Sequence, residues 1–255
     1  MIHIGTSGFS YKDWVGPFYP AELPSSAFLN FYAQEFQTTE VNFTYYRLPD
    51  PRTLARMADK TPDGFVFTVK ASKELTHERE DNAEAFPKFV QALTPLIERN
   101  KFGCVLAQFP WSFRPSAENR DYLRALRGLM ADLPVVVEFR NAQWLSEETF
   151  AMLADNSLGF CCVDEPRLKG LIPPVTRATS NMAYVRFHGR NAKNWWQHDA
   201  AWERYDYSYS LEELQEWVPK IRDLDAKAEH TFLFANNHWQ GQAVDTARQL
   251  RLLLF

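Results

Sequence analysis

Eight short β-rich runs alternate with helical stretches along this chain, and that alternation limits the fold more than any other feature. Each run has four to eight residues and is rich in Val, Phe, Tyr, Thr or Cys, which is typical of buried parallel strands. The expected strands are 2–7, 38–45, 65–71, 103–109, 135–140, 160–163, 183–188 and 231–236. Helices are expected over 26–36, 51–59, 83–100, 116–130 and 242–255, and after Ser146 and Ser210.

Eight such units in 255 residues give about 32 residues per unit, the size of a compact βα repeat. Right-handed crossovers between eight parallel strands favour a closed barrel over an open sheet. We therefore expect an α/β fold, a single TIM-type (β/α)8 barrel with one domain over 1–255, since no linker divides the chain. The sixth crossover lacks a helical period after Asp164 and is expected to be an irregular loop.

Charge and cysteine content narrow the class of protein. Lys and Arg total 28 against 32 Asp and Glu, a net charge of −4 that disfavours broad phosphate-backbone coverage. We expect no transmembrane helix and no signal peptide, and hence a cytoplasmic protein. The three cysteines, Cys104, Cys161 and Cys162, are expected to be buried, reduced thiols.

Polar residues gather where the expected strands end, which is where (β/α)8 barrels build their active sites. Residues i and i+2 share one face of a strand, so polar pairs with this spacing are expected to point into the barrel mouth. The pairs are Glu40 with Asn42, Glu138 with Arg140, Arg186 with His188, and Asn236 with His238. The alternative is a layer of ion pairs, Glu138–Arg140 or Glu40–Arg186, that only fills the barrel.

At these residues the sequence resembles the DUF72 family, also called YecE-like proteins. The similarity covers nearly the whole chain in order and implies a TIM-type barrel, but it implies no reaction. Two positions depart from the family pattern: Asn141 stands where His is common, and Trp111 where Pro is common. The segments that carry the resemblance are 5–14, 40–49, 67–72 with Thr76 and His77, 105–110, 137–140 with Trp144, 163–166, 185–190, and 235–238 with Gly241.

The leading hypothesis is an enzyme, hydrolase- or isomerase-like, that binds a small polar anion such as a sugar phosphate or a nucleotide-like molecule. Glu40, Glu138 and His188 are the candidate acid–base residues, because such work needs groups whose environments separate their pKa values. Candidate ligand-binding residues are those at strand ends able to hold an anion or stack on it. They are Gly5, Ser7, Asn42, Lys70, Gln108, Arg140, Trp144, Asp164, Arg186, Arg190, Asn236 and Asn237.

Two alternatives remain open. A metal-dependent, endonuclease-like barrel acting on nucleic acid would need His77, His188 or His238 to join Glu40, Glu138 or Asp164 around a divalent metal. No HxH or HExxH spacing is present, so no cofactor or metal is expected and nucleic acid is not favoured as a partner. The second alternative is a non-catalytic protein that binds a small ligand. The stretch 191–210, with three Trp and three Tyr, is expected to be a functional loop over the site.

Overall fold

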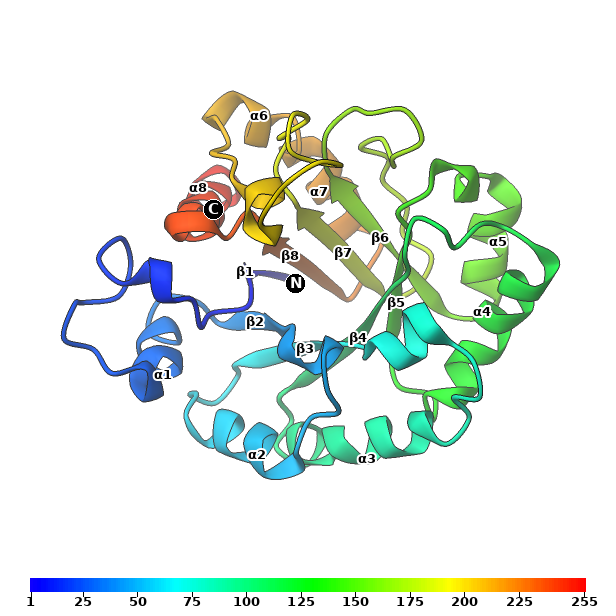
Figure 1. The fold of residues 1–255 in the computed structure, drawn as a ribbon, viewed down its shortest axis with the longest axis horizontal. Helices are drawn as coiled ribbons and strands as arrows, with labels where there is room; N and C mark the ends of the chain where they lie inside the picture. Colours follow the sequence, from blue (N-terminus) through cyan, green and yellow to red (C-terminus); the bar gives the residue numbers. More distant parts are fainter.

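The computed structural model describes residues 1–255 as a closed barrel of eight parallel strands ringed by helices (Figure 1). Each strand pairs with the next along the chain, and β8 pairs with β1 to close the barrel. The predicted (β/α)8 architecture is therefore confirmed. The strands are β1 (Ile2–Ser7), β2 (Thr38–Val41), β3 (Val66–Lys70), β4 (Phe102–Gln108), β5 (Val135–Glu138), β6 (Leu158–Asp164), β7 (Met182–Phe187) and β8 (His230–Ala235).

The helices begin where the sequence offers caps. Asp50, Ser116, Ser146 and Ser210 each accept a hydrogen bond from a backbone N–H of the first helical turn, which satisfies a donor that has no partner within the helix. The helices are α1 (Phe28–Tyr32), α2 (Pro51–Asp59), α3 (Ala85–Glu98), α4 (Ala117–Leu129), α5 (Glu147–Asp155), α6 (Leu211–Gln215), α7 (Val218–Asp225) and α8 (Gln242–Leu254).

Three local expectations need adjustment. β2 ends at Val41, because Phe43–Tyr45 forms a 3-10 turn instead of continuing the strand. α1 has only five residues and follows a 3-10 turn over Ser25–Ala27. α3 begins at Ala85 and ends at Glu98, two residues inside each expected bound, and it includes Pro95 without ending there.

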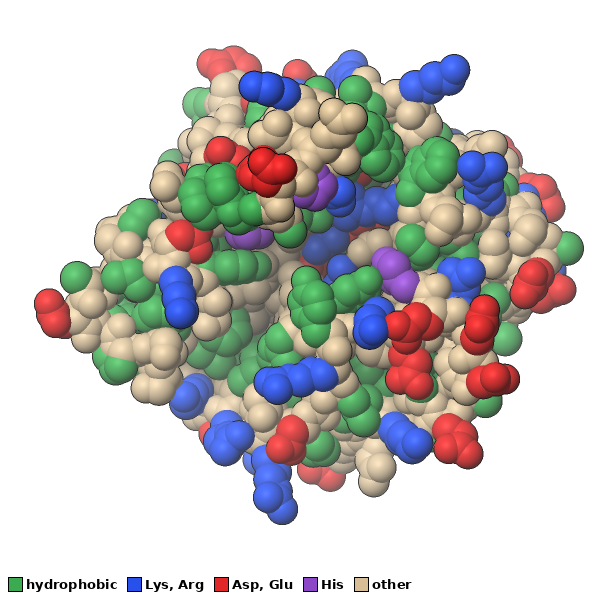
Figure 2. Space-filling view, in the orientation of Figure 1, with side chains coloured by type: hydrophobic (Ala, Val, Ile, Leu, Met, Phe, Trp, Pro, Cys, Tyr) green, Lys and Arg blue, Asp and Glu red, His purple; other side chains and the backbone are tan.

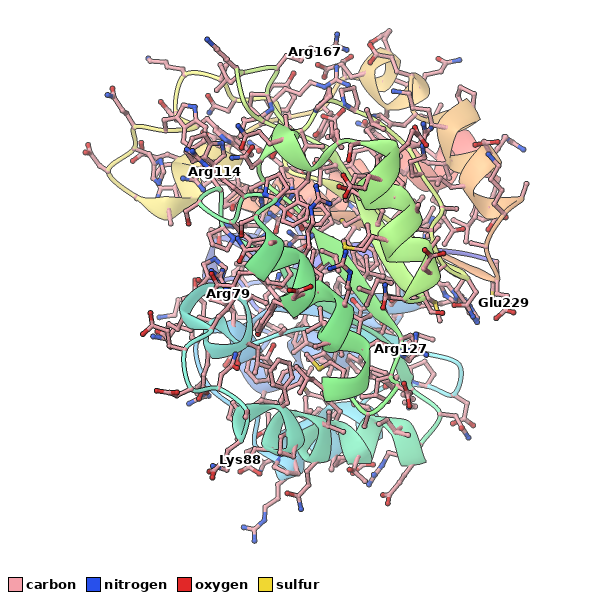
Figure 3. The ribbon with its side chains drawn as sticks, turned by 90° about the vertical axis from the view of Figure 1, so that its right-hand side faces the viewer. Arg79, Lys88, Arg114, Arg127, Arg167 and Glu229 are labelled. Carbon is pink, nitrogen blue, oxygen red and sulfur yellow. The ribbon has the colours of Figure 1, made fainter.

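The loops that follow β6 and β7 are long and cover one end of the barrel. Residues 165–181 contain no helix, which confirms the irregular sixth crossover. After β7 the chain runs without a regular helix until the 3-10 turn Ala201–Tyr205, and α6 begins at Leu211. Arg79 and Arg114 lie in the loops that follow β3 and β4, at the left of the side view. Arg127 and Glu229, which precede β5 and β8, lie farther to the right, toward the other end of the barrel (Figure 3).

One contiguous cluster of 63 buried residues forms the core. Trp14, Trp144 and Trp195 are buried, so these rings pack the barrel. Trp111 and Trp196 remain 39 % and 51 % exposed, so part of each indole ring is accessible to solvent. The three cysteines are buried free thiols, as predicted. No helix has both the length and the apolar composition needed to cross a bilayer.

Candidate functional site

Arg186, on β7, is the centre of a charged network inside the barrel. Its Nη1 donates to Glu138 Oε2 at 2.7 Å and its Nη2 donates to Glu40 Oε1 at 2.7 Å. Tyr184, two residues earlier on the same face, donates to Glu40 Oε2 at 2.6 Å. Arg186 is only 2 % exposed, and buried charges persist only where partners compensate the lost hydration. The predicted convergence of strand-end charges is confirmed.

Glu138, at the end of β5, is surrounded by donors. Arg140 Nε lies 2.8 Å from Oε1, Arg186 Nη1 lies 2.7 Å from Oε2, and His188 Nε2 lies 3.2 Å from Oε1. Burial alone would raise the pKa of Glu138, but Arg140 and Arg186 outweigh it and hold that pKa well below its usual value. Glu138 is fully buried, and this carboxylate stays ionised as a structural anion.

His188 does not have the properties predicted for a proton carrier near neutral pH. Its ring is fully buried between Glu138 and Asn236, whose Nδ2 lies 2.9 Å from His188 Nδ1. Burial, followed by the charge of Arg140, lowers the pKa of His188 well below its usual value. The neutral ring therefore orients Glu138 and lies outside the cavities described below.

Glu165 is a member of this network that the candidate residues did not include. It follows β6 directly, accepts from Arg140 Nη1 at 3.1 Å, and accepts from the backbone N–H of Ile172 at 2.9 Å. Burial raises the pKa of Glu165 to about 7, although Arg140 acts in the opposite direction. Its position immediately after a strand end was the available sequence signal. Tyr184 lay inside an apolar strand, and only the fold reveals its contact with Glu40.

Lys70, the last residue of β3, differs from the two arginines because no carboxylate pairs with it. Its Nζ donates to the neutral amide oxygen Oε1 of Gln108 at 2.8 Å and lies 4.7 Å from the centre of the Tyr45 ring. Burial, followed by the charge of Arg186, lowers the pKa of Lys70 to about 7. Lys70 is partly exposed to the cavities at the barrel mouth.

A cavity of about 350 Å³ opens above this network, and we call it the mouth cavity. In the space-filling view, Lys and Arg side chains lie in a central hollow with hydrophobic side chains around it (Figure 2). The wall combines aromatic rings with amide, imidazole and charged groups. Its lining side chains include Tyr11, Glu40, Asn42, Phe43, Tyr45, Lys70, Arg140, Arg186, Tyr205, Asn236 and His238.

A second cavity of about 400 Å³ adjoins the first, and we call it the aromatic cavity. The two cavities share Tyr45, Tyr46, Lys70, Arg140 and Tyr205, so they form one continuous site. Gln108 at the end of β4 and residues of the loops after β3, β4, β6 and β7 supply the rest of its wall. These residues include His77, Gln108, Trp111, Trp195, Trp196 and Arg204.

Asp164 and Arg190 lie away from the two cavities, contrary to their predicted ligand-binding role. Asp164 accepts from Arg190 Nε at 2.9 Å, from Tyr209 Oη at 2.7 Å and from Trp217 Nε1 at 2.7 Å. Arg190 also pairs with Glu213 at 3.3 Å. These contacts join β6 to the segment that contains α6, because Asp164 falls on the helix-facing side of its strand.

Three further candidates are also structural. Asn237 donates to Tyr207 O and to Thr246 Oγ1, both at 2.9 Å. Trp144 is fully buried and donates to Phe113 O at 2.7 Å. Gly5 allows close packing, since an added Cβ would lie 2.2 Å from Thr38 O.

Gly5 and Ser7 were candidates for holding an anion, but two backbone N–H groups of the segment around them already have hydrogen-bond partners. Thr6 N donates to Tyr32 Oη at 2.9 Å, and Gly8 N donates to Glu40 O at 2.8 Å. The Ser7 hydroxyl lies 3.3 Å from Arg186 Nη2, so this side chain belongs to the network. The turn therefore supports the arginine and offers no backbone cradle at Thr6 or Gly8.

The side chains named for the metal-dependent alternative do not come together in one cluster. No group of three or more His, Cys, Asp or Glu side chains is arranged to hold a metal ion. His188 bonds within the charged network, His77 lines the aromatic cavity, and His238 lines the mouth cavity. The geometry gives no support to the metal-dependent alternative.

Two curated relatives match this sequence, one over the whole chain and one over 58 % of it. YunF of Bacillus subtilis is 34 % identical, and the match covers 100 % of this chain and 95 % of YunF. YecE of Escherichia coli K12 is 28 % identical over 58 % of this chain and 51 % of YecE. Both carry the description UPF0759 protein.

Solved structures agree. A DUF72 family protein from Thermotoga maritima is 41 % identical with a TM-score of 0.92, covering 100 % of this chain and 99 % of that one. A DUF72 family protein from Enterococcus faecalis is 26 % identical with a TM-score of 0.88, covering 100 % and 95 %. The family model described as "Protein of unknown function DUF72" matches residues 3–255. The chain belongs to the DUF72 family.

Proposed function

We propose that the protein is an enzyme that binds a small polar anion, such as a sugar phosphate or a nucleotide-like molecule, in the mouth cavity. The observation that carries the proposal is the state of Lys70. Arg140 and Arg186 are neutralised by buried carboxylates, whereas Lys70 faces the cavity with only a neutral amide as its hydrogen-bond partner. The protonated form of Lys70 has no carboxylate partner, so a negatively charged ligand in the cavity stabilises that form.

A neighbouring cavity of about 320 Å³ strengthens the case for an anion. It adjoins the mouth cavity through Phe9, Ser10 and Phe43. Its cations are the exposed side chains of Arg47, Arg56 and Lys60, none of which forms an ion pair. A ligand in the mouth cavity could extend a phosphate or carboxylate toward these three side chains.

The aromatic cavity supports a ligand that also carries a sugar or a planar ring. Trp111 and Trp196 meet edge to face with their ring centres 6.1 Å apart, and both remain exposed. Exposed aromatic faces beside a polar pocket stack on sugars and bases. A sugar phosphate or a nucleotide-like molecule carries an anionic group for the mouth cavity and a ring for the aromatic cavity.

Acid–base chemistry is assigned to Glu40 among the predicted residues, because it alone lines the mouth cavity. Glu138 and His188 act as positioning residues in this proposal, since neither lines the mouth cavity, although all three side chains are fully buried. Arg186 and Tyr184 fix the two oxygens of Glu40. A fixed carboxylate at the cavity wall can accept or return a proton when a bound ligand lies against it.

Thermal unfolding in increasing inorganic phosphate tests the anion site. We expect the wild-type melting temperature to rise saturably, with stabilisation of about 2.7 kcal/mol at a hundred times the Kd. Lys70→Met should lose this dependence. Lys73→Met should keep it, because Lys73 is exposed and paired with Glu78. An unchanged wild-type melting temperature in millimolar phosphate, sulfate and sugar phosphates would overturn the proposal.

The second candidate is a non-catalytic binding protein. The ion pairs of Glu138 with Arg140 and Arg186 favour it, because they leave this carboxylate unavailable for acid–base chemistry. Turnover separates the two. Incubation with a panel of sugar phosphates and nucleotides, followed by phosphorus NMR, should reveal a product if the protein is an enzyme. Saturable binding with no change in any compound would favour the binding protein.

A further inference from the structure

The Nζ atom of Lys70 has few hydrogen-bond partners and borders open space. It donates a single hydrogen bond, to Gln108 Oε1 at 2.8 Å, and lies over the face of the Tyr45 ring. Lys101 shows the contrast: its buried Nζ donates to Ala58 O, Thr61 O and Thr61 Oγ1, which occupy all three protons. Lys70 instead stands at the boundary that the mouth cavity and the aromatic cavity share.

We propose that Lys70 is an amine nucleophile that forms an imine with the aldehyde or ketone of a small anionic substrate. This inference rests on the proposed function, because it places the substrate in the same site and adds a carbonyl group to it. The geometry that carries it is an ammonium side chain without a carboxylate partner, flanked by two arginines, at the end of a barrel strand and open to a cavity.

The charges around Lys70 favour its neutral, nucleophilic form. Burial and the charge of Arg186 lower the pKa of Lys70 to about 7, against the raising effect of Glu138 and Glu40. A lysine with that pKa is about half neutral at pH 7, whereas an ordinary lysine is neutral in roughly one molecule in 2,500. The ionisable groups that face it are Glu40, Tyr45, His77, Glu138, Arg140 and Arg186.

The reaction balances without a cofactor. The neutral Nζ attacks the carbonyl carbon, and one proton passes from Nζ to the carbonyl oxygen to give a neutral carbinolamine. The carbinolamine hydroxyl then takes one proton from a hydronium ion of the solvent and leaves as water, and the remaining Nζ–H forms a protonated imine. The protonated imine retains one positive charge, so the site still attracts the anionic group of the substrate. Arg47, Arg56 and Lys60 offer that group a separate place.

Pyridoxal 5′-phosphate, an aldehyde that carries a phosphate, is the probe. The protein is mixed with the probe at pH 7, the imine is followed by its absorbance, and borohydride fixes it for peptide mapping. We expect Lys70 to be modified at least about tenfold faster than the exposed Lys73, because its neutral fraction is far larger. Its labelling rate should reach half its maximum near pH 7, while that of Lys73 should still rise above pH 9.

Variants separate this inference from the proposed function. Lys70→Arg keeps the positive charge and removes the nucleophile, so it should retain stabilisation by inorganic phosphate and lose the imine. Lys73→Met should change neither result. Pyridoxine 5′-phosphate, which lacks the aldehyde, should compete with the probe at Lys70 without forming an adduct.

The labelling rates of Lys70 and Lys73 distinguish the imine from the anion site. Labelling of Lys70 no faster than Lys73 overturns the imine, even if phosphate stabilises the wild type and the anion site stands. Rapid labelling of Lys70 that neither phosphate nor pyridoxine 5′-phosphate slows supports a reactive amine and counts against the anion site. Rapid labelling that both compounds slow supports both.

Discussion

Arg186 links Glu40 and Glu138 in the barrel interior, where none of the three side chains is more than 2 % exposed, and these contacts explain why three charges survive there. Sequence parity predicted that these side chains share the barrel interior, and the structure confirms it. Parity could not reveal which of these buried groups would border the mouth cavity. That distinction separates Glu40 from Glu138, since only Glu40 lines the mouth cavity.

Replacing Arg186 should be costly at the residue scale. Arg186→Met leaves two buried carboxylates without their shared partner, and we expect a loss of about 3–5 kcal/mol in the free energy of unfolding. Urea denaturation measures it. Arg124→Met is the matched control, because the Arg124–Asp121 pair is exposed and should contribute less than about 1 kcal/mol.

A double variant checks the cause of that loss. Adding Glu138→Gln to Arg186→Met removes one uncompensated charge, so part of the lost stability should return. A single-variant loss below about 1 kcal/mol would mean that the carboxylates are hydrated in solution.

At the element scale, Asp164 fixes the segment between β7 and α7 to the end of β6. Its carboxylate accepts from Arg190 with both oxygens, at 2.9 and 2.8 Å, and also from Tyr209 and Trp217. The sequence placed Asp164 at a strand end and suggested a ligand contact. The structure shows that its side chain faces the helices, where it orders the segment bearing the wall residues Trp195, Trp196 and Tyr205.

Asp164→Asn should loosen this segment. The amide cannot accept at both ends, so we expect a loss of about 3 kcal/mol in unfolding free energy and faster hydrogen exchange over residues 203–217. Asp223→Asn is the control, because its pair with Lys227 is exposed and contributes little. Unchanged exchange in that segment would show that other contacts hold it.

At the scale of the whole molecule, the first strand closes the barrel between β2 and β8. Gly5 lies where β1 approaches β2 most tightly: an added Cβ would come within 2.2 Å of Thr38 O and 3.0 Å of Tyr32 Oη. The sequence proposed Gly5 for ligand binding, whereas the structure assigns it to barrel closure.

Gly5→Ala should therefore destabilise the protein by about 3 kcal/mol, because backbone atoms of the neighbouring strand must move. Gly128→Ala is the matched change in helix α4. Nothing lies within 4 Å of its Cβ, so it should gain roughly 0.5–1 kcal/mol from helix propensity. Thermal unfolding of both variants compares them. A Gly5→Ala protein as stable as wild type would mean that the strands separate at little cost.

The sequence alone determined the eight strands, the helix caps and the gathering of polar residues at strand ends, because periodicity and capping are local properties of the chain. It also identified Lys70 as a strand-end cation. Only the tertiary structure decided which side chain each charged group pairs with. Neighbours across a barrel come from segments far apart in sequence, as with Arg186 and Glu40, 146 residues apart. Those neighbours set hydration and pKa, so they left Lys70 unpaired while burying Glu138 and His188.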